Sequence, residues 1–506
     1  MKNIFKISLL LLTVLSASCS KDWLDVNTDP NYASNATPEL VFPSAVASTA
    51  SVIGGQYNIM GSIWSQYWTQ SNGANQYKDI DRYNMTTADF NNQFSRIYSG
   101  AFEDYKYVEE KAAASSNWSF YLMATVMEAY SYQMMADLYD QIPYTEACLG
   151  DKGVIHPHYD KGQVVYDSLI VKINKALAKP LNELSTAQAA QDFVFGGDLT
   201  KWAQFANTLK LKIYLRQMYA AGRESIVKKG IEDVFNDPNG FLDSDAAMTQ
   251  FVDEDSKSNP TYEDNVRQLN VATNLRASTT LLFYLKDHGD TRLSKLFATG
   301  SAGTYKGLGQ GDYAVSTDII DPPTISVAKM TATDPVYFIS TAESYFLQAE
   351  AVAYFNSKGW SLNSYTDKDY YDMGVEAAFD KYGIDGSSFV DVGGEYEYPS
   401  TGNFEDEQKA IITQKWLSMV GSEGLEMVFE HNRTHYPATS SVYSMNADHV
   451  TQNSNYVSGN YVLPAGAVIP SFPQRLLFPQ SEEERNPNCP KVSENPITKK
   501  VWWNQK

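Results

Sequence analysis

The sequence predicts a mainly α-helical protein in which neighbouring helices pack in pairs and long loops cover the helical scaffold. Apolar residues recur at helical spacing along most of the chain. The predicted helices follow one another in pairs, and segments rich in Gly, Pro, Asn, Ser and Tyr separate them. Helices that each bury one face against the next indicate a helical-repeat solenoid, although no strict period of about 34 residues is present.

Residues 1–18 are expected to form a secretory signal peptide. They carry Lys2 and Lys6, an apolar run over 9–15 and three small residues before Cys19. The apolar run is too short to span a membrane as a helix. A cysteine directly after the cut site resembles the bacterial lipobox, in which the thiol is acylated and becomes the new N-terminus. The alternative is a secreted protein in which Cys19 stands there by chance. Because two or more acyl chains anchor a protein stably, we expect lipidation of Cys19 to hold the body at a membrane.

The chain after the leader divides into a tether and one body. We expect residues 19–43 to form the lipidated N-terminus and tether, and residues 44–506 to form a single body. Its helical scaffold is predicted mainly over 100–235 and 340–435. Its loop-rich segments, where the surface chemistry is expected, are predicted mainly over 60–95, 237–334 and 436–506.

The first part of the scaffold contains three apolar stripes at helical spacing. They cover 118–134, 166–177 and 202–213, and each predicts a helix with one buried face. Asp198 is a predicted N-cap for the third helix, because an Asp side chain can accept hydrogen bonds from the first free backbone N–H groups. We expect Lys201, Lys210, Lys212 and Arg216 to lie on the solvent-exposed face of this helix.

The second part of the scaffold contains four shorter stripes. They cover 342–353, 370–378, 412–419 and 425–429, again as neighbouring pairs. The last of these helices is expected to end near Asn432–Thr434, before Pro437.

Composition narrows the classes of function. The chain has 506 residues, of which 43% are hydrophobic, so it can bury a sizeable core. A net charge of −20 without a basic stripe argues against a nucleic-acid partner. No run after the leader is long and apolar enough for a transmembrane helix, so the lipid is the only membrane contact that we infer. With Cys19 assigned to lipid, the two remaining cysteines make neither a disulfide framework nor a zinc cluster.

Aromatic residues indicate a ligand site in the loops. The chain has 34 Tyr, 9 Trp and 23 Phe, and aromatic faces suit the apolar faces of sugar rings while amides and charged groups bind the hydroxyls. Most single rings at helical spacing pack inward. The best segment is 63–83, where Trp64 and Trp68 are four residues apart and so share a face on a helix. Trp64 is assigned to the core, and the predicted ligand contacts are Trp68, Asn72, Gln76, Tyr77 and Arg82, with Tyr305 and Tyr313 on an opposing wall.

Other patterns in the loops do not predict cofactor or metal sites. The glycine-rich run 307–311 lacks the strand before it and the helix after it that a phosphate-binding loop requires, so we interpret it as a flexible loop. The pairs His156/His158 and His431/His435 stand in no zinc-binding frame. We therefore predict no cofactor and no metal site. A structural calcium ion in the loops is an open alternative that no motif supports.

Catalysis is the rival class of function, and the sequence disfavours it. A Gly-x-Ser-x-Gly elbow, a Cys–His constellation and a Walker loop are all missing from the sequence. A glycoside hydrolase needs only two suitably spaced carboxylates, and among 60 Asp and Glu residues some pair can meet that requirement by chance. We predict no catalytic residues.

Seven segments in order along the chain resemble SusD/RagB-type nutrient-binding lipoproteins of Bacteroidetes, and they fit best with a divergent SusD-like branch. Each segment is weak alone, but together and in this order they are specific. The segments are Asp22–Asn31, Met135–Ala147, Lys201–Leu211, Ala342–Ala351, Gln414–Leu417, Asn432–Thr434 and Pro473–Pro479.

The resemblance implies both a fold and a role. The fold would be four helix pairs of tetratricopeptide type with a loop-rich remainder that carries the ligand site. The role would be that of a lipid-anchored lid at the cell surface, in the outer membrane, which captures an oligosaccharide and closes over a SusC-type TonB-dependent barrel transporter. Two alternatives stay open: a peptide-binding lid of the same kind, and an adhesin or scaffold without a transport role.

Overall fold

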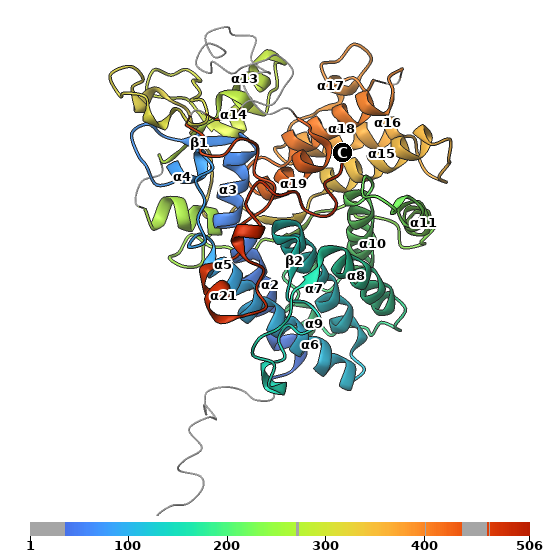
Figure 1. Cartoon of the computed structure of the whole chain (residues 1–506). Coiled ribbons are helices and arrows are strands. Elements are labelled where there is room, and N and C mark those ends of the chain that lie inside the picture. The colour runs from blue at the N-terminus through green and yellow to red at the C-terminus, as the bar shows by residue number, and fades with distance from the viewer. Residues whose placement is uncertain (1–35, 270–272, 400, 438–462, 465) are drawn as a thin grey trace, which may run out of the picture. The chain divides into compact units, whose positions relative to one another are not determined.

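The helices pair along the chain as the apolar spacing predicts (Figure 1). The computed structural model describes residues 36–269, 273–399, 401–437, 463–464 and 466–506, so Cys19 lies outside the described residues. Residues 38–506 form one compact unit. Its first helix is α2, Pro38–Ile53, in which Phe42 is fully buried. Residues 38–43, assigned to the tether from the sequence, therefore belong to the body.

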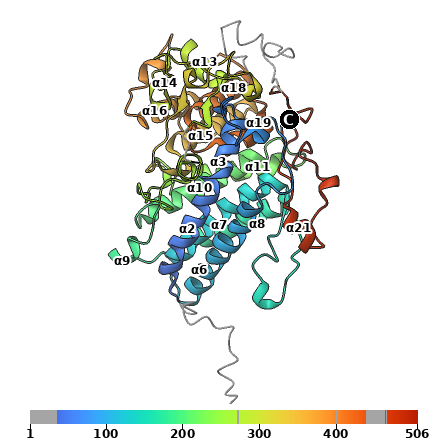
Figure 2. The same ribbon diagram turned by 90° about the vertical axis from the view of Figure 1, so that its left-hand side faces the viewer.

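The first scaffold segment forms a layer of adjacent helices (Figure 2). Helix α6, Glu103–Ala114, packs on α7, Trp118–Tyr139, and α7 packs on α8, Gly162–Leu177. Helix α10, Leu199–Arg216, pairs with α11, Glu224–Phe235. Helix α2 completes this layer against α6 and α7.

The second scaffold segment repeats the pairing. Helix α15, Thr341–Ser357, packs along α16, Asp367–Asp380, and also contacts α18, Phe404–Ser418. Helix α19, Gly424–Thr434, follows and packs on α3, Gln56–Trp64. All seven apolar stripes of the sequence thus lie on helices, and the prediction of a mainly α fold built from paired helices is confirmed.

Side-chain caps fix where several of these helices begin. The Asp198 carboxylate accepts hydrogen bonds from the backbone N–H groups of Thr200 and Lys201 at 3.0 and 3.3 Å, as the sequence predicts. Ser340 caps α15 through the N–H of Glu343, at 3.3 Å. Such caps satisfy donors that have no partner within the helix and stabilise each start by about 1 kcal/mol.

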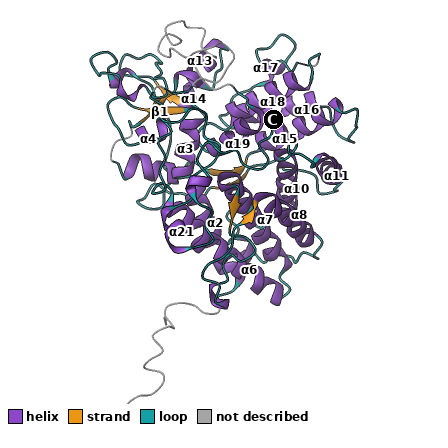
Figure 3. Cartoon of the chain, in the orientation of Figure 1, coloured by secondary structure: helices purple, strands orange, loops and turns teal. Residues whose placement is uncertain are grey.

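Short strands join the loops to the scaffold (Figure 3). One antiparallel sheet has the order β1-β5-β7-β6, with bounds Trp68–Gln70, Leu275–Ala277, Val327–Ala328 and Phe297–Ala298. Strand β4, Ala246–Met248, pairs with β8, Val336–Ile339, and β2, Gln141–Ile142, pairs with β3, Asp160–Lys161. The loop segments also carry helices, among them α4, Lys78–Asp81, α13, Thr279–Asp287, α14, Leu293–Leu296, and α21, Gln480–Arg485. None of the described helices is both long and apolar enough to cross a membrane.

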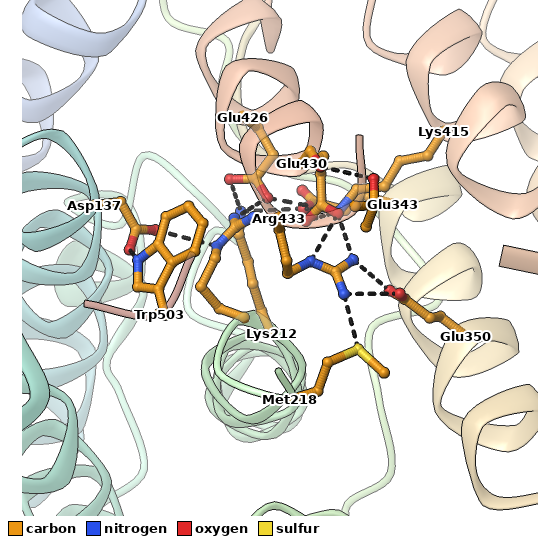
Figure 4. Close-up of polar contacts among 12 residues, drawn as sticks. Asp137, Lys212, Met218, Glu343, Glu350, Lys415, Glu426, Glu430, Arg433 and Trp503 are labelled. Carbon is orange, nitrogen blue, oxygen red and sulfur yellow. Dashed lines mark hydrogen bonds and ion pairs between the residues drawn. The ribbon is translucent and has the colours of Figure 1, made fainter. Parts of the chain in front are cut away.

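A buried ion network ties the two scaffold segments together (Figure 4). Arg216 on α10 binds Glu430 on α19 at 2.7 Å and also pairs with Glu426. Arg433 binds Glu350 on α15 at 2.7 Å and pairs with Glu430. Four further buried residues pair with this group, namely Asp137, Lys212, Glu343 and Lys415. We call all nine residues, these four with Arg216, Glu350, Glu426, Glu430 and Arg433, the ion network.

The ion network corrects one expectation from the sequence. Lys210, Lys212 and Arg216 were placed on the solvent-exposed face of their helix, but they are 5%, 4% and 1% exposed. Helix α10 lies between α7 and α15 and contacts both, so it has neighbours on both sides. Lys212 and Arg216 are balanced by carboxylates from those neighbouring helices, whereas Lys210 donates to Asn174 at 3.1 Å. A buried charge persists when it is paired in this way.

Candidate functional site

The candidate site is built from two loops that meet beside the four-stranded sheet, and we call them the loop pair. The first loop is 65–84 and the second is 305–325. Helix α3 ends at Trp64, and Gln66 has a φ of 57°, so the chain turns and enters β1 at Trp68. Thr69 in β1 lies opposite Arg276 in β5, and Arg276 in turn lies opposite Val327 in β7. The sheet thereby fixes both loops at its edge.

A single buried carboxylate joins the two loops. Asp81 is 0% exposed and accepts hydrogen bonds from the Thr69 hydroxyl at 3.0 Å and the Gln70 backbone N–H at 3.3 Å. Its other oxygen accepts the backbone N–H of Gly311 from the second loop at 2.6 Å. Burial raises the pKa of Asp81 to about 7, because these hydrogen bonds offset only part of the loss of hydration.

The glycine-rich run of the second loop therefore serves to dock this loop. Gly311 has a φ of +85°, a backbone conformation that favours glycine. In the first loop, a Cβ on Gly73 would lie 2.9 Å from the Pro322 ring, so the two backbones approach closely there. The Asn72 side chain donates to the carbonyl of Ile320 at 2.7 Å and to that of Val315 at 3.3 Å. Asn72 thus helps to hold the second loop.

The structure brings Arg82 and Tyr313, from the two loops, close together and leaves Gln76 exposed on the first loop. Gln76 is exposed, and Tyr313 is half-buried. The Arg82 side chain is 31% exposed and binds Asp79 at 2.7 Å. The hydrogen bond to Asp79 raises the pKa of Arg82, and the neighbouring Tyr313 hydroxyl adds to this shift. Gln76, Arg82 and Tyr313 are therefore the accessible members of the predicted set.

Other predicted residues lie inside. Trp68 is 2% exposed in β1 and Tyr77 is 3% exposed, so neither presents a ring face to solvent. Trp64 is 1% exposed, as assigned, and its indole N–H donates to the carbonyl of Ile80 at 3.0 Å. The expectation that Trp64 and Trp68 share a helix face is wrong, because α3 ends between them. Tyr305 is half-buried and packs against the core.

The sequence analysis missed the residues that position the surface. Asp81 and Gly311 are separated by 230 positions along the chain, and neither carries a local motif. The one available signal was an Asp among aromatic residues in the same segment as Arg82. Such an Asp can be an exposed charge or a buried hydrogen-bond acceptor, and the sequence around it does not distinguish the two.

The described residues offer no obvious place for a metal ion. Among them, no group of three or more His, Cys, Asp or Glu side chains is arranged to hold one. His431 packs against Phe472, with ring centroids 4.3 Å apart, and its Nδ1 donates to the carbonyl of Pro437 at 2.9 Å. This histidine is a core residue in a satisfied position.

The accessible chemistry of the loop pair suits a ligand rich in hydroxyl groups. The Gln76 amide can donate and accept, the Arg82 guanidinium donates, and Tyr313 offers both a hydroxyl and a ring. Amphipathic rings beside fixed polar groups are typical of half-wet binding surfaces. The buried hydrogen bonds at Asp81 hold together the two loops that carry these side chains.

A comparison with known families decides the relationship. A SusD-like family model, described as "Starch-binding associating with outer membrane", matches residues 30–456. The chain belongs to this SusD-like family. The resemblance found in the sequence is confirmed, and the family is one whose description joins starch binding to the outer membrane. No curated protein matches the chain at a significant level.

Solved structures agree with the family fold. A SusD homologue from Bacteroides uniformis is 22% identical with a TM-score of 0.69, and the match covers 92% of this chain and 99% of that one. A chitin-binding protein is 21% identical with a TM-score of 0.71, covering 92% and 100%. A chitin-binding SusD homologue from Flavobacterium johnsoniae is 19% identical with a TM-score of 0.70, covering 92% and 98%. At these identities the likeness establishes the SusD-like fold of paired, tetratricopeptide-like helices.

Proposed function

We propose that this protein binds an oligosaccharide through the loop pair and delivers it to a TonB-dependent outer-membrane transporter. The observation that carries the proposal is the SusD-like family match, which spans most of the chain. The loop pair supports it, because Arg82 and Tyr313 lie beside each other, Gln76 is exposed on the same loop as Arg82, and buried hydrogen bonds hold the two loops together. Two of the similar structures are of chitin-binding proteins, which favours a glycan over a peptide.

Binding rather than catalysis is the proposed activity. The accessible predicted contacts, Gln76, Arg82 and Tyr313, are an amide, a guanidinium and a phenol. Of the carboxylates on the first loop, Asp81 is fully enclosed and Asp79 binds Arg82 at 2.7 Å. A glycosidase would need two carboxyl groups facing the scissile bond. Incubation of the purified protein with starch and chitin oligosaccharides should give a titratable complex and no shortened products. Release of shorter sugars would contradict a pure binding role.

The ligand is tested by calorimetry with a panel of neutral oligosaccharides. We expect at least one α-glucan or β-linked N-acetylglucosamine oligomer to bind, and the Arg82→Ala variant to bind it more weakly. Asp318→Asn is the matched control, because Asp318 is exposed on the second loop and lies outside the proposed contact set. Absence of binding across the panel, with a peptide ligand captured instead, would reject the oligosaccharide.

Delivery requires a lid that is held at one end and free at the other. We propose that acylated Cys19 anchors the protein at the cell surface and that the segment before α2 serves as the tether that lets the lid open and close. Deleting residues 22–33 should reduce uptake by cells while the purified variant keeps its ligand affinity. Equal losses of uptake and affinity would count against a tethered lid. Co-purification with a SusC-type barrel tests the partner separately.

A further inference from the structure

A groove in another part of the body shares no lining residue with the loop pair. It lies between α13, α16, the segment 394–399 and α18, and has a volume of about 480 Å³. Residues of all three helices line it, and Figure 2 shows the helices at the same end of the body. We call it the α13–α18 groove. Nothing in the SusD-like signature segments other than Gln414 contributes to its lining.

One wall of the groove is aromatic. The half-buried His288 ring stacks on Tyr284 with centroids 4.1 Å apart and an interplanar angle of 19°. Tyr396 lies parallel to Tyr284, with centroids 6.4 Å apart, and donates its hydroxyl to Asp290 at 2.7 Å. The Nδ1 of His288 contacts the Tyr284 carbonyl at 2.8 Å and so must carry the proton. In this tautomer Nε2 is the ring nitrogen that can accept a hydrogen bond.

The rim of the groove is acidic. Glu395, Glu397 and Asp406 are all exposed there, and Lys409 is the one Lys or Arg in its lining. Among the residues that the structure describes, no cation forms an ion pair with any of these three carboxylates. Three unpaired negative charges around an open groove favour a cationic occupant.

An unsatisfied acceptor stands in the same groove. Gln414 is 3% exposed, and its side-chain oxygen has no hydrogen-bond partner within the described part of the chain. Leaving a buried acceptor unpaired costs about 1–3 kcal/mol. A ligand that donates a hydrogen bond here would recover that free energy, so Gln414 points to a donor-rich occupant independently of the rim charges.

We infer that the α13–α18 groove binds an amino sugar that carries a free ammonium group. The ammonium would lie near Glu395, Glu397 and Asp406, while the apolar face of the sugar ring would stack on His288. Hydroxyl groups would donate to Gln414 and to Nε2 of His288. A volume of about 480 Å³ is far larger than one ammonium group requires, which favours a ring-bearing ligand over a simple amine.

The ammonium is tested with two matched disaccharides. The double variant Arg82→Ala/Tyr313→Ala, in which the loop pair is impaired, is titrated with the β-1,4 dimer of glucosamine and with its N-acetylated counterpart, at a pH below the amine pKa. We expect the free amine to bind at least tenfold more tightly than the acetylated sugar. Equal affinities would overturn the inference. A lysine dipeptide is a third arm, and tighter binding of that peptide than of the amino sugar would also overturn it.

The position is tested with two charge-matched triple variants. Glu395→Gln/Glu397→Gln/Asp406→Asn should weaken binding of the glucosamine dimer at least tenfold. The control variant changes the same residue types at distant exposed positions, namely Glu110→Gln/Glu183→Gln/Asp255→Asn. The control should bind like the unmodified protein. Equal weakening in both would mean that the net charge of −20 attracts the amine without a site.

Two single variants separate this groove from the loop pair. His288→Ala should weaken binding of the glucosamine dimer severalfold without changing the carboxylates, whereas Arg82→Ala should leave it unchanged. Loss of amine binding in Arg82→Ala would assign the ligand to the loop pair and reject the groove. Neutral oligosaccharides report on the loop pair alone, so failure of the groove and failure of the proposed function give different results.

Discussion

The ion network and the loop pair both join distant parts of the chain, but by different means. The ion network uses four cations, Lys212, Arg216, Lys415 and Arg433, against carboxylates on neighbouring helices. The loop pair uses one buried carboxylate, Asp81, with backbone and amide hydrogen bonds. The charges of the ion network pair with one another inside the protein, whereas the loop pair leaves Gln76, Arg82 and Tyr313 accessible. Stability and recognition are therefore assigned to different regions.

The difference also explains what the family signature encodes. Glu343 and Glu350 lie in the segment Ala342–Ala351, while Lys415 and Arg433 lie in two other signature segments. These segments meet in the ion network and not at the loop pair. These three segments therefore mark the scaffold, whereas the proposed ligand contacts lie in loops that none of the seven segments contains.

The largest expected effect is the loss of Arg433. Arg433→Ala leaves Glu350 buried without its cation and removes one of the three cations around Glu430, which should lower the free energy of unfolding by about 3–5 kcal/mol. Chemical denaturation measures the change. Lys229→Ala, which removes an exposed pair with Asp233, is the control and should change stability by less than about 0.5 kcal/mol. If Arg433→Ala and Lys229→Ala change the free energy of unfolding by similarly small amounts, the ion network does not stabilise the fold.

Asp81 should give an intermediate effect that also reaches the ligand. In Asp81→Asn the new amide N–H₂ would face the N–H of Gly311 or Gln70, so one buried hydrogen bond is lost, at about 1–3 kcal/mol. Because the second loop would undock, oligosaccharide affinity should fall as well. If Asp81→Asn weakens stability but binds ligand normally, the loop pair does not position the site.

The pH dependence of stability tests the burial of Asp81 directly. Its folded pKa is raised from 3.8 to about 7, so the folded state holds this proton more tightly than the unfolded state. The contribution of Asp81 to stability is fully present below about pH 4 and is lost as pH rises toward 7. Denaturation of the unmodified protein should show this decline more steeply than that of Asp81→Asn. Parallel profiles for the two proteins would place the Asp81 pKa near its ordinary value.

The smallest expected effect belongs to the exposed edge of the loop pair. Gln76→Ala removes one exposed amide and should leave the free energy of unfolding unchanged while lowering oligosaccharide affinity by about 0.5–1.5 kcal/mol. Calorimetry with the ligand found in the oligosaccharide panel measures it. A loss of stability at Gln76 would show that this residue belongs with the buried part of the loop.

Much of the scaffold was predictable from the sequence because its signals are local. Apolar spacing and the Asp198 cap act within one helix, so α7, α8 and α10 could be assigned from the chain alone. The burial of Lys212 and Arg216 was not predictable, because their partners lie on other helices. A cationic helix face has the same local pattern whether it meets water or carboxylates.

The meeting of the two loops agrees with the sequence, but the positions of several side chains on them do not. Both loops were expected to form opposing walls, and they do meet. Trp68 was expected to be a stacking platform, yet its burial in β1 means that Trp68→Ala would test core packing, at about 3–5 kcal/mol of stability. The end of α3 at Trp64 decides this, and neither Gly nor Pro marks it in the sequence.

The most direct test of the account uses the double variant Arg82→Ala/Tyr313→Ala. This variant is titrated with the oligosaccharide that the unmodified protein binds, which tests whether recognition lies in the loop pair and not in the scaffold. Both side chains are partly exposed on the loop pair and neither takes part in the ion network. We predict at least a tenfold loss of affinity with unchanged melting. Retained affinity, or a loss of affinity that merely follows a fall in melting temperature, would contradict the assignment of recognition to the loop pair.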